Sequence, residues 1–148
     1  MIQAVLEYAS IVWDPYHAKN IEQVERIQCH AARFISSDYR KRSYVTNMLR
    51  QHKLEPLQMR RQIARLKFLH LLYHNKTGLP HDSYLLCAPQ RSSRLNHTKV
   101  IRPYNARTKQ FQKCFFPCTV EQWNRLPASV VECTNINTFE RSLQAYPL

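Results

Sequence analysis

The residues of this chain best suited to chemistry are lysines and arginines, and they gather in one stretch. Residues 56–113 hold twelve of the 22 basic side chains and a single acid, Asp82, so this stretch carries a net charge of +11. A block of like charge costs folding free energy through self-repulsion, which favours a polyanionic partner as the reason for it. The alternative is a solvated basic face that only keeps the protein soluble.

The candidate phosphate-binding side chains form two sets. Four lie on a predicted helix at residues 57–74, where Arg61 and Arg65 are one turn apart and could follow successive phosphates of a duplex. The other seven lie in a looser, extended segment. In chain order the eleven candidates are Arg60, Arg61, Arg65, Lys67, Arg91, Arg94, Lys99, Arg102, Arg107, Lys109 and Lys113.

Two alternatives remain open for these sets. Arg60 and Arg61 could instead pair with Glu25, Glu55 or the carboxyl ends of helices. Tyr104 and Phe111 lie among the basic residues of the second set. Aromatic rings in such a place either stack on unpaired bases or anchor the loop to the core.

Catalytic carboxylates are not evident. A polymerase needs paired carboxylates that hold two metal ions, but the three aspartates, Asp14, Asp38 and Asp82, are isolated in the sequence. No serine or cysteine carries the local signature of a nucleophile with a partnered histidine. We therefore expect no enzymatic activity from this chain in isolation.

A metal site is a further alternative. His70 and His74 are spaced to share one helix face, and Cys114 and Cys118 could add two thiolates, a set that would suit zinc. The spacing does not match a recognised finger, which usually shows a tighter Cys-x-x-Cys pair. The simpler interpretation is two polar helix positions and two small buried cysteines, so we expect no metal and no cofactor.

Composition favours helices and a reducing compartment. A single glycine argues against tight hairpins and glycine-rich phosphate loops. Five cysteines without framework spacing, and no signal peptide, predict an intracellular protein, nuclear or cytoplasmic. No apolar run is long enough to span a membrane.

The sequence predicts a mainly α fold, with a bundle of about four helices, a basic extended linker and a small C-terminal lobe that is α-helical or irregular. We expect domains at 1–78, 79–113 and 114–148, with Gly78 as the left-handed residue that ends the fourth helix. The expected helices are at 4–13, 20–37, 43–52, 57–74, 120–126 (capped by Thr119) and 137–146, and the expected extended pieces are at 98–101 and 111–117.

Four motifs in order resemble a known family. They are LEYASIVWDP at 6–15 followed by IEQVERIQ at 21–28, LEPL at 54–57, FFP at 115–117 and WNRLP at 123–127. Together they resemble the region C-terminal to the reverse transcriptase core in non-LTR (LINE-type, jockey-like) retrotransposon polyproteins of animals. The resemblance covers roughly residues 4–143. One departure is Cys118, where the family usually has a basic residue, which puts a phosphate contact there in doubt.

The resemblance implies a thumb-like helical segment that holds the template–primer duplex while a palm domain, absent from this chain, does the chemistry. It also implies that the chain is a fragment of an RNA-directed DNA polymerase. We therefore expect binding of RNA, DNA or their hybrid without sequence specificity, with the missing palm as a further partner. The rival hypotheses are a helical protein-interaction module and an inactive relic open reading frame.

Overall fold

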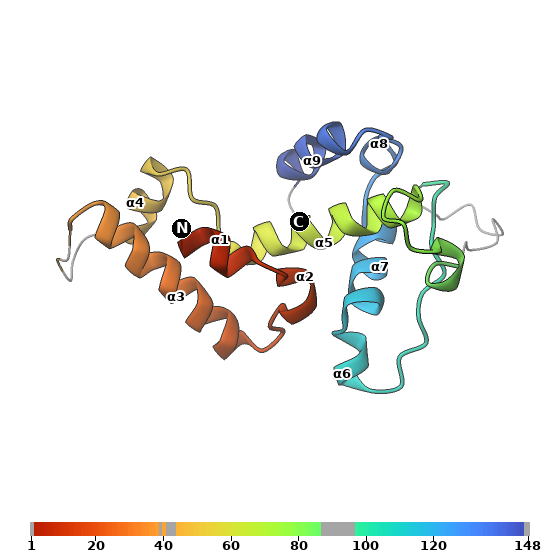
Figure 1. Ribbon diagram of the computed structural model, residues 1–148, viewed down its shortest axis with the longest axis horizontal. Coiled ribbons are helices and arrows are strands. Elements are labelled where there is room, and N and C mark those ends of the chain that lie inside the picture. The colour runs from red at the N-terminus through yellow and green to blue at the C-terminus, as the bar shows by residue number, and fades with distance from the viewer. Residues whose placement is uncertain (1, 39, 41–43, 87–96, 147–148) are drawn as a thin grey trace. The chain divides into compact units, whose positions relative to one another are not determined.

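The computed structural model describes residues 2–38, 40, 44–86 and 97–146, and helices dominate these ranges (Figure 1). The expectation of a mainly α protein is confirmed, and no extended strand forms in the described ranges. The chain divides into two compact units, Met1–Gln62 (unit 1) and Ile63–Leu148 (unit 2). The structure thus divides at residue 62 rather than at 78, inside the long helix.

The described residues of unit 1 form four helices and the start of a fifth. They are α1 (Ile2–Glu7), α2 (Ser10–Trp13), α3 (Ala18–Ile35), α4 (Val45–Gln51) and the first residues of α5 (Leu57–Tyr73). The helix expected at 4–13 is interrupted, because Ala9 takes a left-handed conformation (φ 50°) between α1 and α2. The helix expected at 20–37 begins earlier, at Ala18.

Polar groups of α3 hold the entry to α5. The Glu25 carboxylate accepts a hydrogen bond from the Gln58 backbone N–H (2.8 Å), where a negative charge is favourable at a helix N-terminus. The Gln28 side chain donates to the Glu55 carbonyl (2.9 Å). These two bonds fix the Glu55-Pro56 turn against α3, and they place Glu25 at a backbone N–H rather than beside an arginine.

Unit 2 is organised around Trp123. It contains the rest of α5, a 3₁₀ turn (His81–Ser83), α6 (Lys109–Gln112), α7 (Phe115–Arg125), α8 (Ala128–Val131) and α9 (Ile136–Ala145). The last of these confirms the helix expected at 137–146. Trp123 is completely buried, together with Leu66, Leu69 and Phe139, which come from three helices and form one core.

The extended piece expected at 111–117 is wrong. Phe115, Phe116 and Pro117 begin α7, and Cys114 rather than Thr119 precedes its first turn. Aromatic residues favour strands in general, but the first N–H groups of a helix have no intrahelical acceptor, so proline fits there without losing a bond. Thr119 is buried inside the helix.

In the described ranges, three helices end in a Schellman motif whose left-handed residue is not glycine. After α3, α4 and α5 these are Ser37 (φ 50°), Lys53 (φ 53°) and Asn75 (φ 55°). Each is flanked by the two backbone hydrogen bonds of a Schellman motif, as when Lys76 N–H donates to Leu71 and Asn75 N–H donates to Leu72. The prediction that Gly78 ends α5 is therefore wrong. Gly78 is left-handed (φ 75°), but it lies in the following turn.

The length and the apolar character of a helix decide whether it can cross a membrane. Among the described residues, no helix combines enough length with enough apolar character to cross a bilayer.

Candidate nucleic-acid interface

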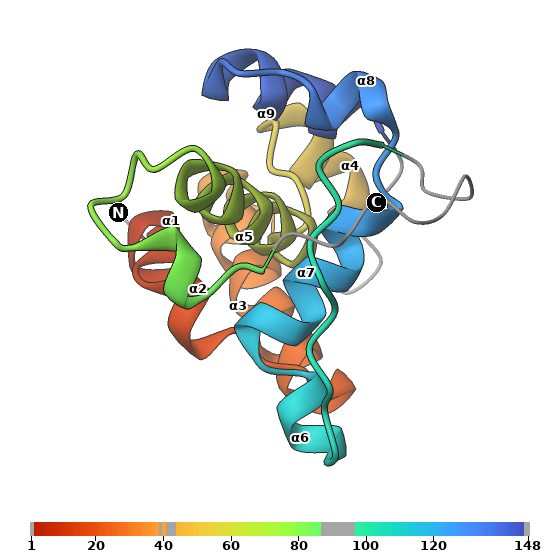
Figure 2. The ribbon, with the colours of Figure 1, turned by 90° about the vertical axis from the view of Figure 1, so that its right-hand side faces the viewer.

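The expected linker (79–113) is described at 79–86 and 97–113, and the second of these ranges, residues 97–113, is called the basic stretch below. Its first residues are bonded to α7. The Trp123 indole N–H donates to the Lys99 carbonyl (2.9 Å). The ring of His97 is buried, and its Nε2 lies 3.1 Å from the Trp123 carbonyl, to which a protonated Nε2 donates. Figure 2 shows the stretch running alongside α7 toward α6. A buried indole N–H usually finds a hydrogen-bond acceptor, and here the acceptor is a backbone carbonyl.

Asn124 replaces a β-strand partner for the stretch. Its side-chain oxygen accepts from the Ile101 N–H (3.0 Å), and its side-chain nitrogen donates to the Ile101 carbonyl (2.7 Å). Both polar groups of one extended residue are thus satisfied by a single amide side chain. No ladder forms at the short strand expected at 98–101, where the backbone bends at Thr98 and forms a single β-bridge at Ile101.

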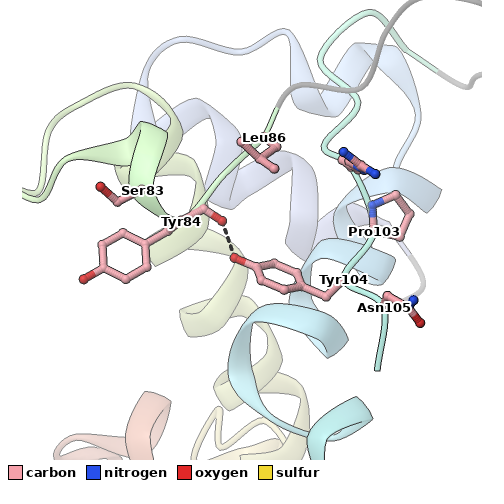
Figure 3. A pocket seen from close by; sticks show the side chains of 7 residues that line it. Ser83, Tyr84, Leu86, Pro103, Tyr104 and Asn105 are labelled. Atoms are coloured by element: carbon pink, nitrogen blue, oxygen red, sulfur yellow. Dashed lines mark hydrogen bonds between the residues drawn. The ribbon is translucent and has the colours of Figure 1, made fainter. Parts of the chain in front are cut away.

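An aromatic cluster anchors the middle of the stretch. The Tyr104 hydroxyl donates to the Tyr84 carbonyl (Figure 3), and burial raises the pKa of that hydroxyl. The Tyr104 ring lies 5.8 Å from Phe116 and 6.4 Å from Phe111, and Tyr84 stacks on Phe116 at 5.3 Å. These contacts show that Tyr104 and Phe111 anchor the stretch to the core, and stacking on unpaired bases stays a prediction. Apart from their aromatic type, nothing in the sequence indicated that Tyr84 and Phe116 would belong to this cluster.

The end of the stretch turns into α6 and then into α7. The Thr108 hydroxyl caps α6 by accepting from the Phe111 N–H (3.2 Å). Lys109 lies in the first turn of this short helix, and Lys113 directly follows its last residue. Both side chains therefore extend from a backbone of defined conformation. Both side chains are exposed.

Four predicted phosphate ligands are exposed and lack an ion pair with any described residue. They are Arg102, Arg107, Lys109 and Lys113. The cause is visible in the sequence, because no acid occurs between Asp82 and Glu121. Asp82 lies beside His81 (2.9 Å), and Glu121 pairs with Arg125 one turn along α7. The four cations therefore project an uncompensated positive field from one segment.

Arg60 and Arg61 are in a different situation. Arg60 Nη1 lies 2.6 Å from Glu7, and Arg61 Nε lies 2.9 Å from Asp14. The Arg61 side chain is 1% exposed, so it is a buried structural residue and the phosphate contact predicted for it is not available. The structural alternative was right for Arg61, with Asp14 as partner rather than Glu25 or Glu55.

The remaining candidates are partly engaged. Lys67 pairs with Glu140 on α9 (2.7 Å). Lys99 donates to the Val131 carbonyl (3.3 Å), and its ammonium lies 6.0 Å from the centre of the Tyr73 ring. Arg65 is half-buried on α5 and has contacts of its own. Arg91 and Arg94 lie outside the described residues.

The histidine pair on α5 is part of the core. His70 is fully buried, stacks on Phe139 at 4.4 Å and has its Nε2 2.7 Å from the Cys133 carbonyl, so Nε2 carries the proton. Burial lowers the pKa of His70. Burial, followed by the charges of His70 and Lys99, lowers the pKa of His74 to about 4. Within the described ranges, no three His, Cys, Asp or Glu side chains come close enough together to hold a metal ion.

We compared the whole chain with family models, curated proteins and solved structures. None of the three comparisons gives a match.

Proposed function

We propose that this chain binds the phosphate backbone of nucleic acid, duplex or hybrid, without sequence specificity. The observation that supports this best is the set of four exposed cations, Arg102, Arg107, Lys109 and Lys113, without described acidic partners. Phosphate contacts position a nucleic acid but carry no base information, and release of condensed counterions makes their affinity depend on salt.

The resemblance in the four sequence motifs supports a more specific form of the proposal. In that form, the chain is the thumb-like and post-polymerase region of a non-LTR reverse transcriptase, and it holds template and primer for a palm domain. Its isolated aspartates supply no pair of metal-binding carboxylates. Purified protein should therefore add no nucleotide to a primer on an RNA template with magnesium or manganese present.

The backbone proposal is tested by the salt dependence of duplex binding in matched variants. Arg107→Gln/Lys109→Gln removes two charges from the basic stretch, and Lys19→Gln/Arg50→Gln removes two exposed charges from unit 1. Each neutralised phosphate contributes about −0.9 to the slope of log affinity against log salt, so the first variant should flatten that slope by about 1.8. The second variant should leave the slope unchanged.

Equal slopes in the two variants would mean that binding follows total charge, and would remove the basic stretch from the proposal. No salt-dependent binding by the unmodified protein would reject the proposal itself. Far-UV circular dichroism on all three proteins checks that the comparison is made between folded molecules.

One observation favours protein interaction as a second candidate function. Unit 1 exposes several large apolar side chains, among them Val12 (87% exposed) and Phe34 (70%), and exposed apolar surface is what a protein partner would cover. This candidate predicts concentration-dependent association in light scattering that persists at high salt, whereas nucleic-acid binding is lost there.

A further inference from the structure

We infer that unit 2 also holds a pocket for one unpaired nucleotide, beside the cations that follow the backbone. The pocket lies between residues 83–86 and residues 102–105, and the inference rests on the proposed function (Figure 3). Its volume is about 360 Å³. That volume is at the lower end of the range for small-molecule sites and suits a single ring with its phosphate.

Two hydrogen bonds join the two segments that form the walls of the pocket. The Arg102 N–H donates to the Leu86 carbonyl (2.7 Å), and the Tyr104 hydroxyl donates to the Tyr84 carbonyl. The segments are therefore tied together on both sides of Pro103. The Phe116 ring packs against the rings of both Tyr84 and Tyr104 and so supports the two segments. A site tied in this way needs little ordering when a ligand enters.

The lining combines the groups that a nucleotide needs. Leu86, Pro103 and Tyr104 offer apolar or aromatic surface to a flat base, and the Arg102 guanidinium is suited to a phosphate. Asn105 and Ser83 add an amide and a hydroxyl, and no acidic side chain belongs to the lining. An anion with an aromatic ring fits this chemistry.

The position of the pocket favours a nucleotide within a strand over a free one. Arg107, Lys109 and Lys113 follow the pocket along the same stretch and are exposed. A strand whose phosphates lie on these cations would bring the next nucleotide to Arg102. A base in a duplex is stacked on both faces and cannot enter, so the pocket should distinguish unpaired from paired ends.

The test compares a blunt duplex with the same duplex carrying a five-nucleotide single-stranded overhang, at one fixed salt concentration. The pocket variant is Leu86→Ser, and its matched control is Leu79→Ser. Both leucines are exposed in unit 2 (58% and 44%), and Leu79 does not line the pocket. Base stacking on protein rings predicts that the unmodified protein favours the overhang by about fivefold or more.

The preference should fall by about twofold or more in Leu86→Ser, which removes one of the three apolar surfaces offered to the base, and stay unchanged in Leu79→Ser, with blunt-duplex affinity equal in both. Equal preferences in the two variants, or none in the unmodified protein, would overturn the pocket while salt-dependent duplex binding still upholds the proposed function. Loss of duplex binding in the unmodified protein would reject the proposed function instead. If a labelled acidic peptide containing tyrosine binds more tightly than the overhang, and loses affinity in Leu86→Ser, the pocket belongs to a protein partner and the inference fails.

Discussion

In unit 2, buried apolar side chains extend from Ile63 on α5 to Leu143 on α9 and surround Trp123. In unit 1, the buried apolar residues of the described ranges are Ala32, Met48 and Leu57. Polar contacts such as that of Glu25 with the N-terminus of α5 add to this small core, and the helices of unit 1 also expose apolar surface. Most of the folding free energy from apolar burial is therefore in the unit that carries the proposed binding site.

The largest effect is expected from removing the central side chain of unit 2, Trp123. Trp123→Ala removes a fully buried indole and its hydrogen bond to Lys99, so unit 2 should lose about 3–5 kcal/mol of stability. Trp13→Ala is the matched change in unit 1. Trp13 is partly exposed and lies 5.8 Å from the Arg61 guanidinium, so its loss should cost about 1 kcal/mol or less. Chemical denaturation followed by far-UV circular dichroism measures both, and equal losses would contradict the comparison.

The next effect concerns the buried ion pair of unit 1. Arg61→Gln removes the cation 2.9 Å from the Asp14 carboxylate in a largely buried place and should cost about 3 kcal/mol. Arg60→Gln breaks a more exposed pair with Glu7 and should cost less than about 1 kcal/mol. Trp13 fluorescence in a Trp123→Phe background reports unit 1 during urea unfolding. A salt slope for nucleic acid that falls in Arg61→Gln, without loss of stability, would return Arg61 to the interface.

A smaller effect depends on pH and belongs to unit 2. The pKa values of His70 and His74 are lowered in the folded protein, so the unfolded chain binds protons first as the pH falls below about 6.5. Stability should therefore be complete above pH 6.5 and decrease toward pH 4, on the order of 1 kcal/mol after allowance for the partial exposure of His74. Melting temperatures of His74→Gln should show a weaker decrease over this window, and those of His81→Gln should follow the unmodified protein.

The smallest effects come from the left-handed helix ends. Lys53→Gly in unit 1 relieves a conformation that is unfavourable for a residue with a Cβ, although glycine also gains entropy when unfolded. We expect a net gain of about 0.5–1 kcal/mol. Asn75→Gly in unit 2 should change stability by less than about 0.5 kcal/mol, since asparagine tolerates this conformation. A shift of the melting temperature in the opposite order would contradict this assignment of the helix ends.

Helix positions were largely predictable from sequence because their apolar periodicity is local. The bounds of α5 show this, since Pro56 before it and the repeated apolar positions within it mark the helix well. The start of α7 was not predictable in the same way, because Phe115 and Phe116 favour strands and only the position of Pro117 argues for a helix. The position of Gly78 also gave a wrong prediction for the end of α5, where Asn75 takes the left-handed conformation.

The candidate site was predictable in its charge but not in its geometry. The excess of cations at residues 97–113 follows directly from the sequence. Which arginines are buried depends on long-range contacts, such as that between Arg61 and Asp14, which no local pattern encodes. The pocket was missed for the same reason, since Leu86 and Arg102 are brought together by a backbone hydrogen bond between distant segments.

The double hydrogen bond from Asn124 to Ile101 has a consequence for how the binding surface can change over time. The two hydrogen bonds between Asn124 and Ile101, like that between Trp123 and Lys99, are made to the main chain of the stretch. The side chains at positions such as Arg102 and Arg107 are therefore not needed to keep the segment in place. Substitutions there can alter the charge, and hence the affinity and the choice of ligand, without disturbing the fold. The binding properties of the stretch can therefore change in evolution while its structure is kept.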